Sequence, residues 1–493
     1  MASLLTPRSI VTPFMEQTLN HIVKQFDLSK FNLNNLCNGN YIYTLSRYKE
    51  LLLQITSKLN ISPDIIDEYL LNLMKTEYFP EVVKRIEYIE SIPLIEQKTP
   101  EWFKQRETMI SASDAGYFLK KGGGVSKAID ALKIKVGLKS YCNSSAPPLM
   151  HGNTYEDVSR AIYESRNCVS VTEYGILSSP TPCVGASPDG IVTKCHKDTY
   201  ECQIKFGRLL EIKNPYSRII DNTVKPEYMV QILQQQYTTQ LPICDFVETT
   251  IVDAYCNTNN SNYKPYMNLA DMLEDKLDKT RDGWEKRIKN KNISNDNLNK
   301  FGNEKGLLIW YKKKINDNDI RNKYVLYPLT SEYEKLAIEK WIVDTNSEYW
   351  KQGFQYVCTK FWRLDVYCEK TVVYDQALFE DEYVPELCKV WDVITKCNEI
   401  RANNANIDNV DNVNNAGNSN NENNEWECIN HITIDETNLK LTNFIEELEK
   451  NKDSPFYNEN KRKKKVKTNE DVKANSKDNS KNYPDKEIIE LDF

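Results

Sequence analysis

Two short strings, Ser187-Pro188-Asp189-Gly190 and Glu211-Ile212-Lys213, decide how this chain folds and which chemistry it can perform. Each is flanked by apolar residues that predict buried strands. Alternate residues of a strand point to the same face, so Glu211 and Lys213 are expected to project together. The turn before them is expected to place Asp189 beside this pair.

These three side chains have the chemistry of metal-dependent phosphodiester hydrolysis. Two carboxylates can hold a divalent cation through hard oxygen ligands. A lysine beside them can orient or deprotonate a water and stabilise the charge that develops on a phosphate. Charges in a short apolar strand are costly to bury without a partner or a metal. The similar string Glu274-Asp275-Lys276 lacks this apolar context, and there a charged helix face is expected.

The residues around the two strings predict an α/β fold with a mixed central β-sheet flanked by helices. Strands are predicted near residues 169–177, 182–186, 190–194, 207–213 and 246–252, and helices over 151–166 and 226–240. Helices and strands that alternate in this way pack in layers around one sheet.

Changes in composition divide the chain into five segments. They are a helical N-terminal region (1–96), a core (97–256), an α+β insertion (257–350), a return to the core (351–398) and a tail (399–493). In the first, Ser62-Pro63-Asp64 has the pattern of a helix start. In the insertion, residues 307–311 and 323–327 predict a hairpin. The core is expected to resume with strands at 354–358 and 360–374 and a helix at 384–397. Residues 401–425 are rich in asparagine, which predicts disorder in the tail.

Composition excludes several classes of protein. The chain has 493 residues with a formal net charge of -7, so any contact with nucleic acid must come from a local patch. No apolar run approaches the ~20 residues of a membrane span, and no secretory signal opens the sequence. The 13 cysteines contain no CxxC pair, which indicates reduced thiols and an intracellular protein.

Two features of the tail leave alternatives open. The basic run at residues 461–467 is either a solvated segment that attracts phosphates or a nuclear-localisation sequence. The final residues, 488–493, mix acidic and apolar side chains. They form either a docking peptide for a replication or recombination partner or an inert end.

Other polar residues of the core are candidates for the same site. Glu156, on a predicted helix, could supply a third carboxylate. Gln231 and Gln235 share one helix face at i, i+4, with Tyr228 one turn upstream. The alternative for the glutamines is a polar helix face in solvent.

Taken in order, these motifs resemble the phage lambda exonuclease and YqaJ viral recombinase family. The motifs are Arg106, Ile110-Ser111-Ala112-Ser113, Tyr155-Glu156, Ser187-Pro188-Asp189-Gly190, Glu211-Ile212-Lys213-Asn214-Pro215 and Tyr228 with Gln231. These proteins are alkaline-exonuclease relatives within the PD-(D/E)xK nuclease superfamily. The resemblance covers about residues 97–256 and 354–397, and it implies a restriction-endonuclease-like core. The asparagine-rich segment resembles that of homologues in large DNA viruses.

The resemblance implies a catalytic role for five positions. Asp189, Glu211 and the backbone carbonyl of Ile212 would bind Mg²⁺ or Mn²⁺, and Glu156 would serve the same metal centre. Lys213 would activate or position the attacking water.

The resemblance also implies contacts with substrate. Gln231 would help to orient the water or the phosphate. Arg106, Ser113 and Ser187 match positions that bind phosphates, including a 5′-terminal phosphate. Tyr228 is expected to contact substrate with them. An arginine presents a planar fork of donors that suits phosphate oxygens. Leu233 departs from the pattern, because the family often has a second glutamine there.

The implied function is that of a Mg²⁺-dependent exonuclease. It would digest duplex DNA ends in the 5′-to-3′ direction and leave 3′ single-stranded overhangs for recombination or repair of replicating viral DNA. A single-strand annealing protein is the implied partner, homo-oligomers are implied by the rings of family members, and no membrane is involved. The implied location is the host cytoplasm, at the viral replication site, or the nucleus. Two alternatives remain: a structure- or sequence-dependent endonuclease, and a non-catalytic DNA-binding recombination scaffold.

Overall fold

A computed structural model describes the larger part of the chain. The described residues are 62–93, 95, 97, 99–119, 121–122, 124–139, 146–181, 183–254, 265–274, 304–316 and 319–414, together with Gln17, Lys49 and Leu53. The chain divides into two compact units, Met1–Asn406 and Ile407–Phe493. The basic run 461–467 and the C-terminal peptide 488–493 lie outside the described residues.

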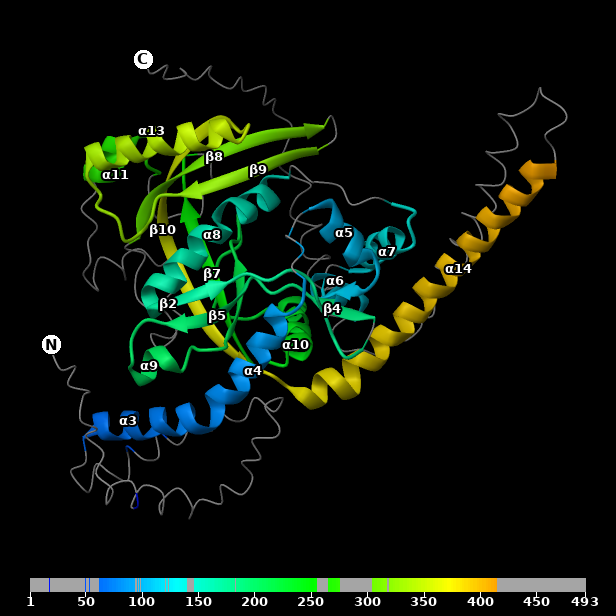
Figure 1. The fold of residues 1–493 in the computed structure, drawn as a ribbon, viewed down its shortest axis with the longest axis horizontal. Helices are drawn as coiled ribbons and strands as arrows, with labels where there is room; N and C mark the ends of the chain where they lie inside the picture. Colours follow the sequence, from blue (N-terminus) through cyan, green and yellow to red (C-terminus); the bar gives the residue numbers. More distant parts are fainter. Residues whose placement is uncertain are drawn as a thin grey trace, which may run out of the picture. The chain divides into compact units, whose positions relative to one another are not determined.

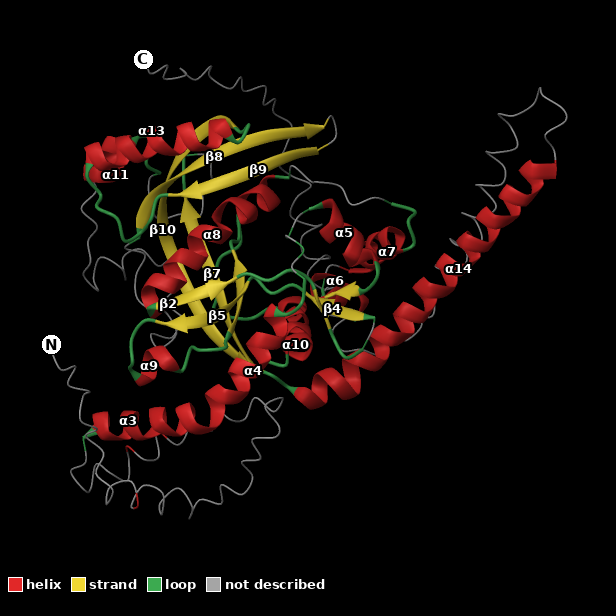
Figure 2. Cartoon of the chain, in the orientation of Figure 1, coloured by secondary structure: helices red, strands yellow, loops and turns green. Residues whose placement is uncertain are grey.

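A seven-stranded mixed sheet forms the centre of the first unit (Figure 2). Its strands, in spatial order, are β2 (Val169–Thr172), β5 (Gly190–Cys195), β6 (Leu209–Lys213), β7 (Ile243–Val252), β10 (Gln355–Val373), β8 (Lys305–Asn316) and β9 (Asp319–Leu326). Within this sheet β6 and β7 run parallel, and the other neighbouring strands are antiparallel. The predicted α/β fold with a mixed central sheet is confirmed.

A second, three-stranded sheet lies beside the first in the same unit. Its spatial order is β1 (Ile110–Ser111), β4 (Val184–Ala186) and β3 (Leu177–Ser178), with β1 parallel to β4. Gln234 connects this sheet to the core, because its Nε2 donates to the carbonyl oxygens of Ile110 and Gly185 at 2.9 and 2.8 Å.

Helices surround the sheets (Figure 1). They are α3 (Pro63–Leu73), α4 (Phe79–Glu90), α5 (Pro100–Glu107), α6 (Ala112–Phe118), α7 (Gly124–Lys135), α8 (Pro147–Asn167), α9 (Tyr200–Gln203), α10 (Pro226–Thr239), α11 (Leu269–Glu274), α13 (Lys335–Lys351) and α14 (Val384–Asn414). In the described part of the chain, no helix has the length and apolar character needed to cross a membrane. The nine cysteines described there are free thiols.

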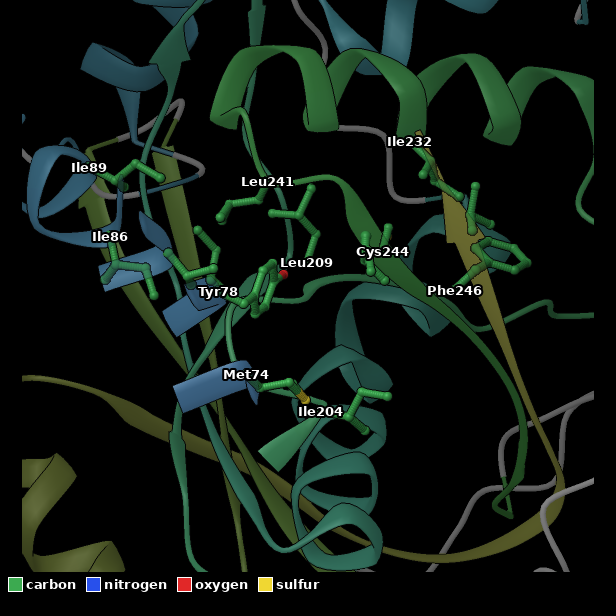
Figure 3. Packing of buried hydrophobic residues seen from close by; sticks show 14 of the residues in the cluster. Met74, Tyr78, Ile86, Ile89, Ile204, Leu209, Ile232, Leu241, Cys244 and Phe246 are labelled. Carbon is green, nitrogen blue, oxygen red and sulfur yellow. The ribbon is translucent and has the colours of Figure 1, made fainter. Parts of the chain in front are cut away.

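The described N-terminal helices belong to the hydrophobic core. α3 begins as predicted, with Ser62 as N-cap and Pro63 in the first turn. Leu70 of α3 and Ile86 of α4 pack in one cluster with Leu209 of β6. Figure 3 shows Met74 and Tyr78, from the π-helical turn between the two helices, in the same cluster. The two helices therefore support the strand that carries Glu211 and Lys213.

The region predicted to be an insertion contributes strands to the central sheet. The predicted hairpin is confirmed as β8 and β9, which join the core through β10. The two strands predicted at 354–358 and 360–374 are instead the single long strand β10. It keeps pairing through register shifts at Tyr356/Cys358 and Leu364/Val366, because an irregular residue bends a strand without ending it.

Helix α14 corrects part of the disorder prediction. The helix continues to Asn414, so residues 401–414 of the asparagine-rich segment are helical. The packed first turns, with Leu387 and Ile394 buried, nucleate the helix, and each further residue then adds a hydrogen bond. Residues 415–425 lie outside the described residues.

Candidate active site

The carboxylate of Glu211 lies at the centre of a small cluster on β6. Its side chain is fully buried. Lys213 Nζ forms an ion pair with Glu211 Oε1, as the strand periodicity predicted. Gln235 Nε2 of α10 donates to Glu211 Oε2 at 2.6 Å. Asp189 joins the cluster by accepting a hydrogen bond from the Ile212 amide at 2.7 Å.

Local sequence explains why Asp189 reaches β6. It occupies the turn between β4 and β5, and the next residue, Gly190, pairs with Leu210 of β6. A Cβ atom on Gly190 would lie 2.2 Å from Val171 Cγ1, so only glycine fits between the turn and β2. The glycine therefore allows the turn to pack closely and hold Asp189 beside Glu211.

The cluster carries more negative than positive charge. Burial raises the pKa of the Asp189 carboxyl well above its usual value, and repulsion from Glu211 and Glu156 raises it further. Burial alone would lower the pKa of Lys213, but attraction to Glu211 and Asp189 raises it. Three carboxylates and one ammonium group therefore share this site.

These residues fit a divalent cation by their chemistry. Carboxylates and backbone carbonyls are hard oxygen ligands, and a cation would relieve the repulsion between Asp189 and Glu211. Among the described residues, no three His, Cys, Asp or Glu side chains form a ready-made metal cluster. Asp189 and Glu211 are therefore the two carboxylates whose chemistry fits a cation.

A cavity of about 140 Å³ lies next to Asp189. Its wall includes six of the predicted site residues: Arg106, Ser113, Glu156, Ser187, Asp189 and Gln231. Glu211 and Lys213 do not line it, but both interact electrostatically with Asp189, which does. Tyr228 is likewise set back from it, with its ring centroid 5.2 Å from Lys213 Nζ.

Hydrogen-bond donors gather at another part of this cavity. Arg106 Nη2 donates to Ser111 Oγ at 2.8 Å and to Ser113 Oγ at 2.7 Å. The guanidinium lies 4.6 Å from the ring of Trp102, in cation–π contact. Thr99 caps α5, the helix that carries both Trp102 and Arg106.

A buried ion pair between Lys135 and Asp114 contacts the backbone of Arg106. Lys135 of α7 has a fully buried side chain, lies 3.4 Å from Asp114 Oδ2, and donates to the Arg106 carbonyl oxygen. Asp114 in turn accepts a hydrogen bond from Ser111 Oγ at 2.6 Å. These contacts fix the orientation of the donors that face the cavity.

Sequence reasoning found one of these contributors and missed another. Gln235, expected to share a helix face with Gln231, contacts the catalytic candidate Glu211 directly. Leu233, where the family often has glutamine, is a buried core residue. Lys135 gave no signal, because α7 approaches α5 only in the folded chain.

A mixed sheet with two carboxylates and a lysine beside a donor-lined cavity defines an α/β domain with a candidate phosphodiester-cleaving site. Comparison with known proteins agrees with this class. Residues 101–242 match the YqaJ-like viral recombinase domain, which confirms the resemblance predicted from the motifs.

Individual relatives extend the comparison. An uncharacterized protein of Acanthamoeba polyphaga mimivirus is 29% identical over 354 residues, which cover 66% of this chain and 57% of that protein. The chain thus matches a protein of a large DNA virus over little more than half of that protein's length. An alkaline exonuclease (LHK-Exo) from Laribacter hongkongensis, solved alone and in complex with dAMP, is 28% identical. That match covers 31% of this chain and 74% of the exonuclease, with a TM-score of 0.25.

Proposed function

We propose that this chain is a divalent-metal-dependent deoxyribonuclease that digests one strand of duplex DNA from its 5′ end. The observation that carries the proposal is the convergence of Asp189, Glu211 and Lys213 beside the cavity that Arg106 and Ser113 line. The match to a viral recombinase domain supports it.

The residues fit Mg²⁺, with Mn²⁺ as an alternative. Asp189, Glu211 and the Ile212 carbonyl would hold the ion, and Glu156, on the same cavity wall, would serve the same centre. When bound, the metal supplies Lewis-acid polarisation of the phosphate and lowers the pKa of a bound water.

The chain's own residues perform the remaining tasks. Glu211 holds Lys213 in place, and the ammonium group stabilises negative charge on the phosphate that is attacked. Gln235 fixes the orientation of Glu211 through its 2.6 Å hydrogen bond. Gln231, on the cavity wall, presents an amide that can orient the water or a phosphate oxygen.

The donor-lined part of the cavity suits a terminal phosphate. Arg106 offers a planar fork, and Ser113 and Ser187 add hydroxyls on the same wall. A 5′ phosphate held there would place the next phosphodiester toward Asp189. Tyr228, which contacts Lys213, completes the substrate side.

The product would be a 3′ single-stranded overhang. A strand-annealing protein would use it in recombination or repair of replicating viral DNA, in the host cytoplasm or the nucleus. Members of the recombinase family that assemble into rings suggest a homo-oligomer around duplex DNA.

The test is a digestion time course with Mg²⁺ on duplexes labelled at either end, with and without a 5′ phosphate. We expect loss of the 5′ label first, an intact covalently closed circle, and faster digestion of phosphorylated ends. Arg106→Lys keeps the charge but removes the fork, and it is expected to reduce the preference for a 5′ phosphate about tenfold. Cleavage of the closed circle would assign the chain to the endonucleases, and the absence of any metal-dependent cleavage would leave a DNA-binding scaffold.

A further inference from the structure

The hairpin of β8 and β9 carries a run of basic residues outside the candidate active site. β8 carries Lys312, Lys313 and Lys314 in succession, and β9 is the edge strand of the central sheet. Residues 101–242, which match the recombinase domain, do not include this hairpin. Its role therefore requires a separate explanation.

The hairpin has two faces with different neighbours. Leu308 belongs to the hydrophobic cluster that includes Tyr155 of α8. Leu307, one residue earlier, belongs to the cluster that includes Ile338 of α13. Because side chains alternate along a strand, one face of the hairpin continues the surface of α8 and the other continues that of α13.

The α8 face combines aromatic rings with lysines. Trp310, Lys312 and Lys314 follow Leu308 at two-residue steps, so they share its face. Trp310 stacks on its cross-strand partner Tyr324, with ring centroids 6.0 Å apart and planes inclined by 25°. Lys312 Nζ lies 4.5 Å from the Trp310 ring. We call this set, with Lys360 of β10, the cationic strip.

The cationic strip leads toward the candidate active site. Lys360 Nζ lies 5.9 Å from the ring of Trp310 and 5.9 Å from the ring of Tyr155. Tyr155 immediately precedes Glu156, which lines the cavity. Figure 1 shows β8 and β9 crossing above α8 and projecting beyond it. The strip therefore runs from the tip of the hairpin to the helix that carries a catalytic candidate.

We propose that the cationic strip binds single-stranded DNA beside the nuclease cavity. The proposal rests on the proposed function, since it takes DNA to be the molecule that reaches the cavity. Aromatic rings alternating with lysines are suited to single strands, because unpaired bases stack on the rings while the lysines contact the phosphates. In duplex DNA the base faces are already covered by stacking.

The charge of the hairpin also supports single-stranded DNA as the ligand of the cationic strip. Lys360 of the strip pairs with Asp253 at 3.3 Å, whereas Lys312 and the far-face residues Arg321 and Lys323 form no ion pair with a carboxylate among the described residues. The acidic residues of the hairpin are Asp317 in the turn and Asp319 at the start of β9, so the basic character lies on the strand residues further from the turn. A polyanion can therefore bind there by releasing its counterions.

The two faces provide a matched control within one hairpin. Lys312→Gln with Lys314→Gln removes two charges from the cationic strip. Arg321→Gln with Lys323→Gln removes two charges from the opposite face, since these residues pair with Lys313 and Tyr311. Both variants change net charge equally and leave the candidate catalytic residues intact.

The experiment measures binding of the full chain to a fluorescent 30-nucleotide single strand and to a blunt duplex, in EDTA so that no digestion occurs. The strip variant is expected to bind the single strand roughly 20-fold more weakly at 0.1 M salt, with the slope of log K against log salt shallower by about 1.4. The opposite-face variant is expected to bind as the unmodified chain does. Trp310→Leu is expected to weaken single-strand binding at least fivefold through lost stacking, with little effect on the salt slope.

Three results would overturn the proposal: equal losses in the two double variants, no loss in either, or a loss confined to the duplex. Failure of the proposed function is distinguished by a separate readout. If the strip variant loses single-strand affinity but no protein digests DNA with Mg²⁺, the strip stands and the nuclease assignment fails. If the strip variant digests DNA normally and binds the single strand as the unmodified chain does, the nuclease assignment holds and the strip proposal fails.

Discussion

Two clusters of buried charge lie on neighbouring parallel strands, and they are built differently. Glu211 of β6 and Asp245 of β7 are both fully buried carboxylates. Around Asp245, the hydrogen bonds and ion pairs come from two cations and two hydroxyls, each at 2.8 Å: Lys205, Arg208, Tyr163 and Thr371. Glu211, by contrast, has one lysine and one glutamine as partners, Lys213 and Gln235. Two further carboxylates, Asp189 and Glu156, belong to the same cluster.

The pKa values of the two clusters shift in opposite directions. Burial alone would raise the pKa of Asp245, but attraction to Arg208 and Lys205 holds it well below its usual value. Asp189, by contrast, has a raised pKa from burial and from its acidic neighbours. The balanced cluster stabilises the fold, whereas the unbalanced cluster has negative charge left for a cation.

The largest expected effect comes from the unbalanced cluster. Asp189→Asn keeps the shape and the hydrogen bond from the Ile212 amide but removes a metal-binding charge. We expect at least a thousandfold loss of Mg²⁺-dependent digestion, about 4 kcal/mol of transition-state stabilisation. The free energy of unfolding is expected to stay unchanged or rise, because repulsion from Glu211 disappears. Urea denaturation alongside the digestion assay measures both, and a destabilised but active variant would reverse the roles of the clusters.

The balanced cluster is expected to give the opposite pattern. Asp245→Asn leaves Arg208 buried without its carboxylate, while Lys205 keeps its ion pair with Glu369, at a cost of about 3 kcal/mol in the free energy of unfolding. Because the pKa of Asp245 is depressed in the fold, its stabilisation is complete above the unfolded pKa of ~3.9 and is lost as pH falls further. Digestion per folded molecule is expected to be unchanged.

Asp344→Asn provides the control for this change. That aspartate lies on exposed α13 and pairs with Lys340, and its side chain is 62% exposed. The same substitution there is expected to cost less than about 1 kcal/mol. Equal losses at the two positions would show that Asp245 is no more important than a surface charge.

His151 is a third buried titratable group, and burial is the largest cause of its pKa shift. Its ring packs against Tyr155 and Tyr216, with centroids 4.8 and 5.5 Å away. Burial lowers the pKa of His151 to about 4, and the charge of Lys360 lowers it too, against the attraction of Asp253. An unfolded histidine titrates near ~6.5, so the unfolded chain binds more protons between these values.

The pH dependence of unfolding tests this shift. Stability is expected to fall by about 3 kcal/mol as pH decreases from ~6.5 to 4, and His151→Phe is expected to remove that decline. Replacing the exposed His196 with glutamine serves as the control for the loss of a histidine that is not buried. A decline that persists in His151→Phe would assign it to other groups.

The sequence predicted the candidate active site better than it predicted the structure around it. The spacing of Glu211 and Lys213 was sufficient, because two residues along a strand return to the same face. The network around Asp245 was not anticipated, since its members come from α8, the turn between α9 and β6, β7 and β10, and only folding brings them together. Likewise, the hairpin was visible as two apolar runs, but its attachment to the central sheet depends on long-range pairing with β10.

Thermal unfolding with and without Mg²⁺ tests most directly whether the unbalanced cluster is a cation site. Mg²⁺ at a hundred times its dissociation constant is expected to stabilise the unmodified chain by about 2.7 kcal/mol. The double variant Asp189→Asn, Glu211→Gln is expected to show no such stabilisation relative to its own unfolding temperature without metal, which is lower because Lys213 loses its ion pair with Glu211. An equal Mg²⁺-dependent rise in both proteins would contradict the assignment of the metal to this cluster.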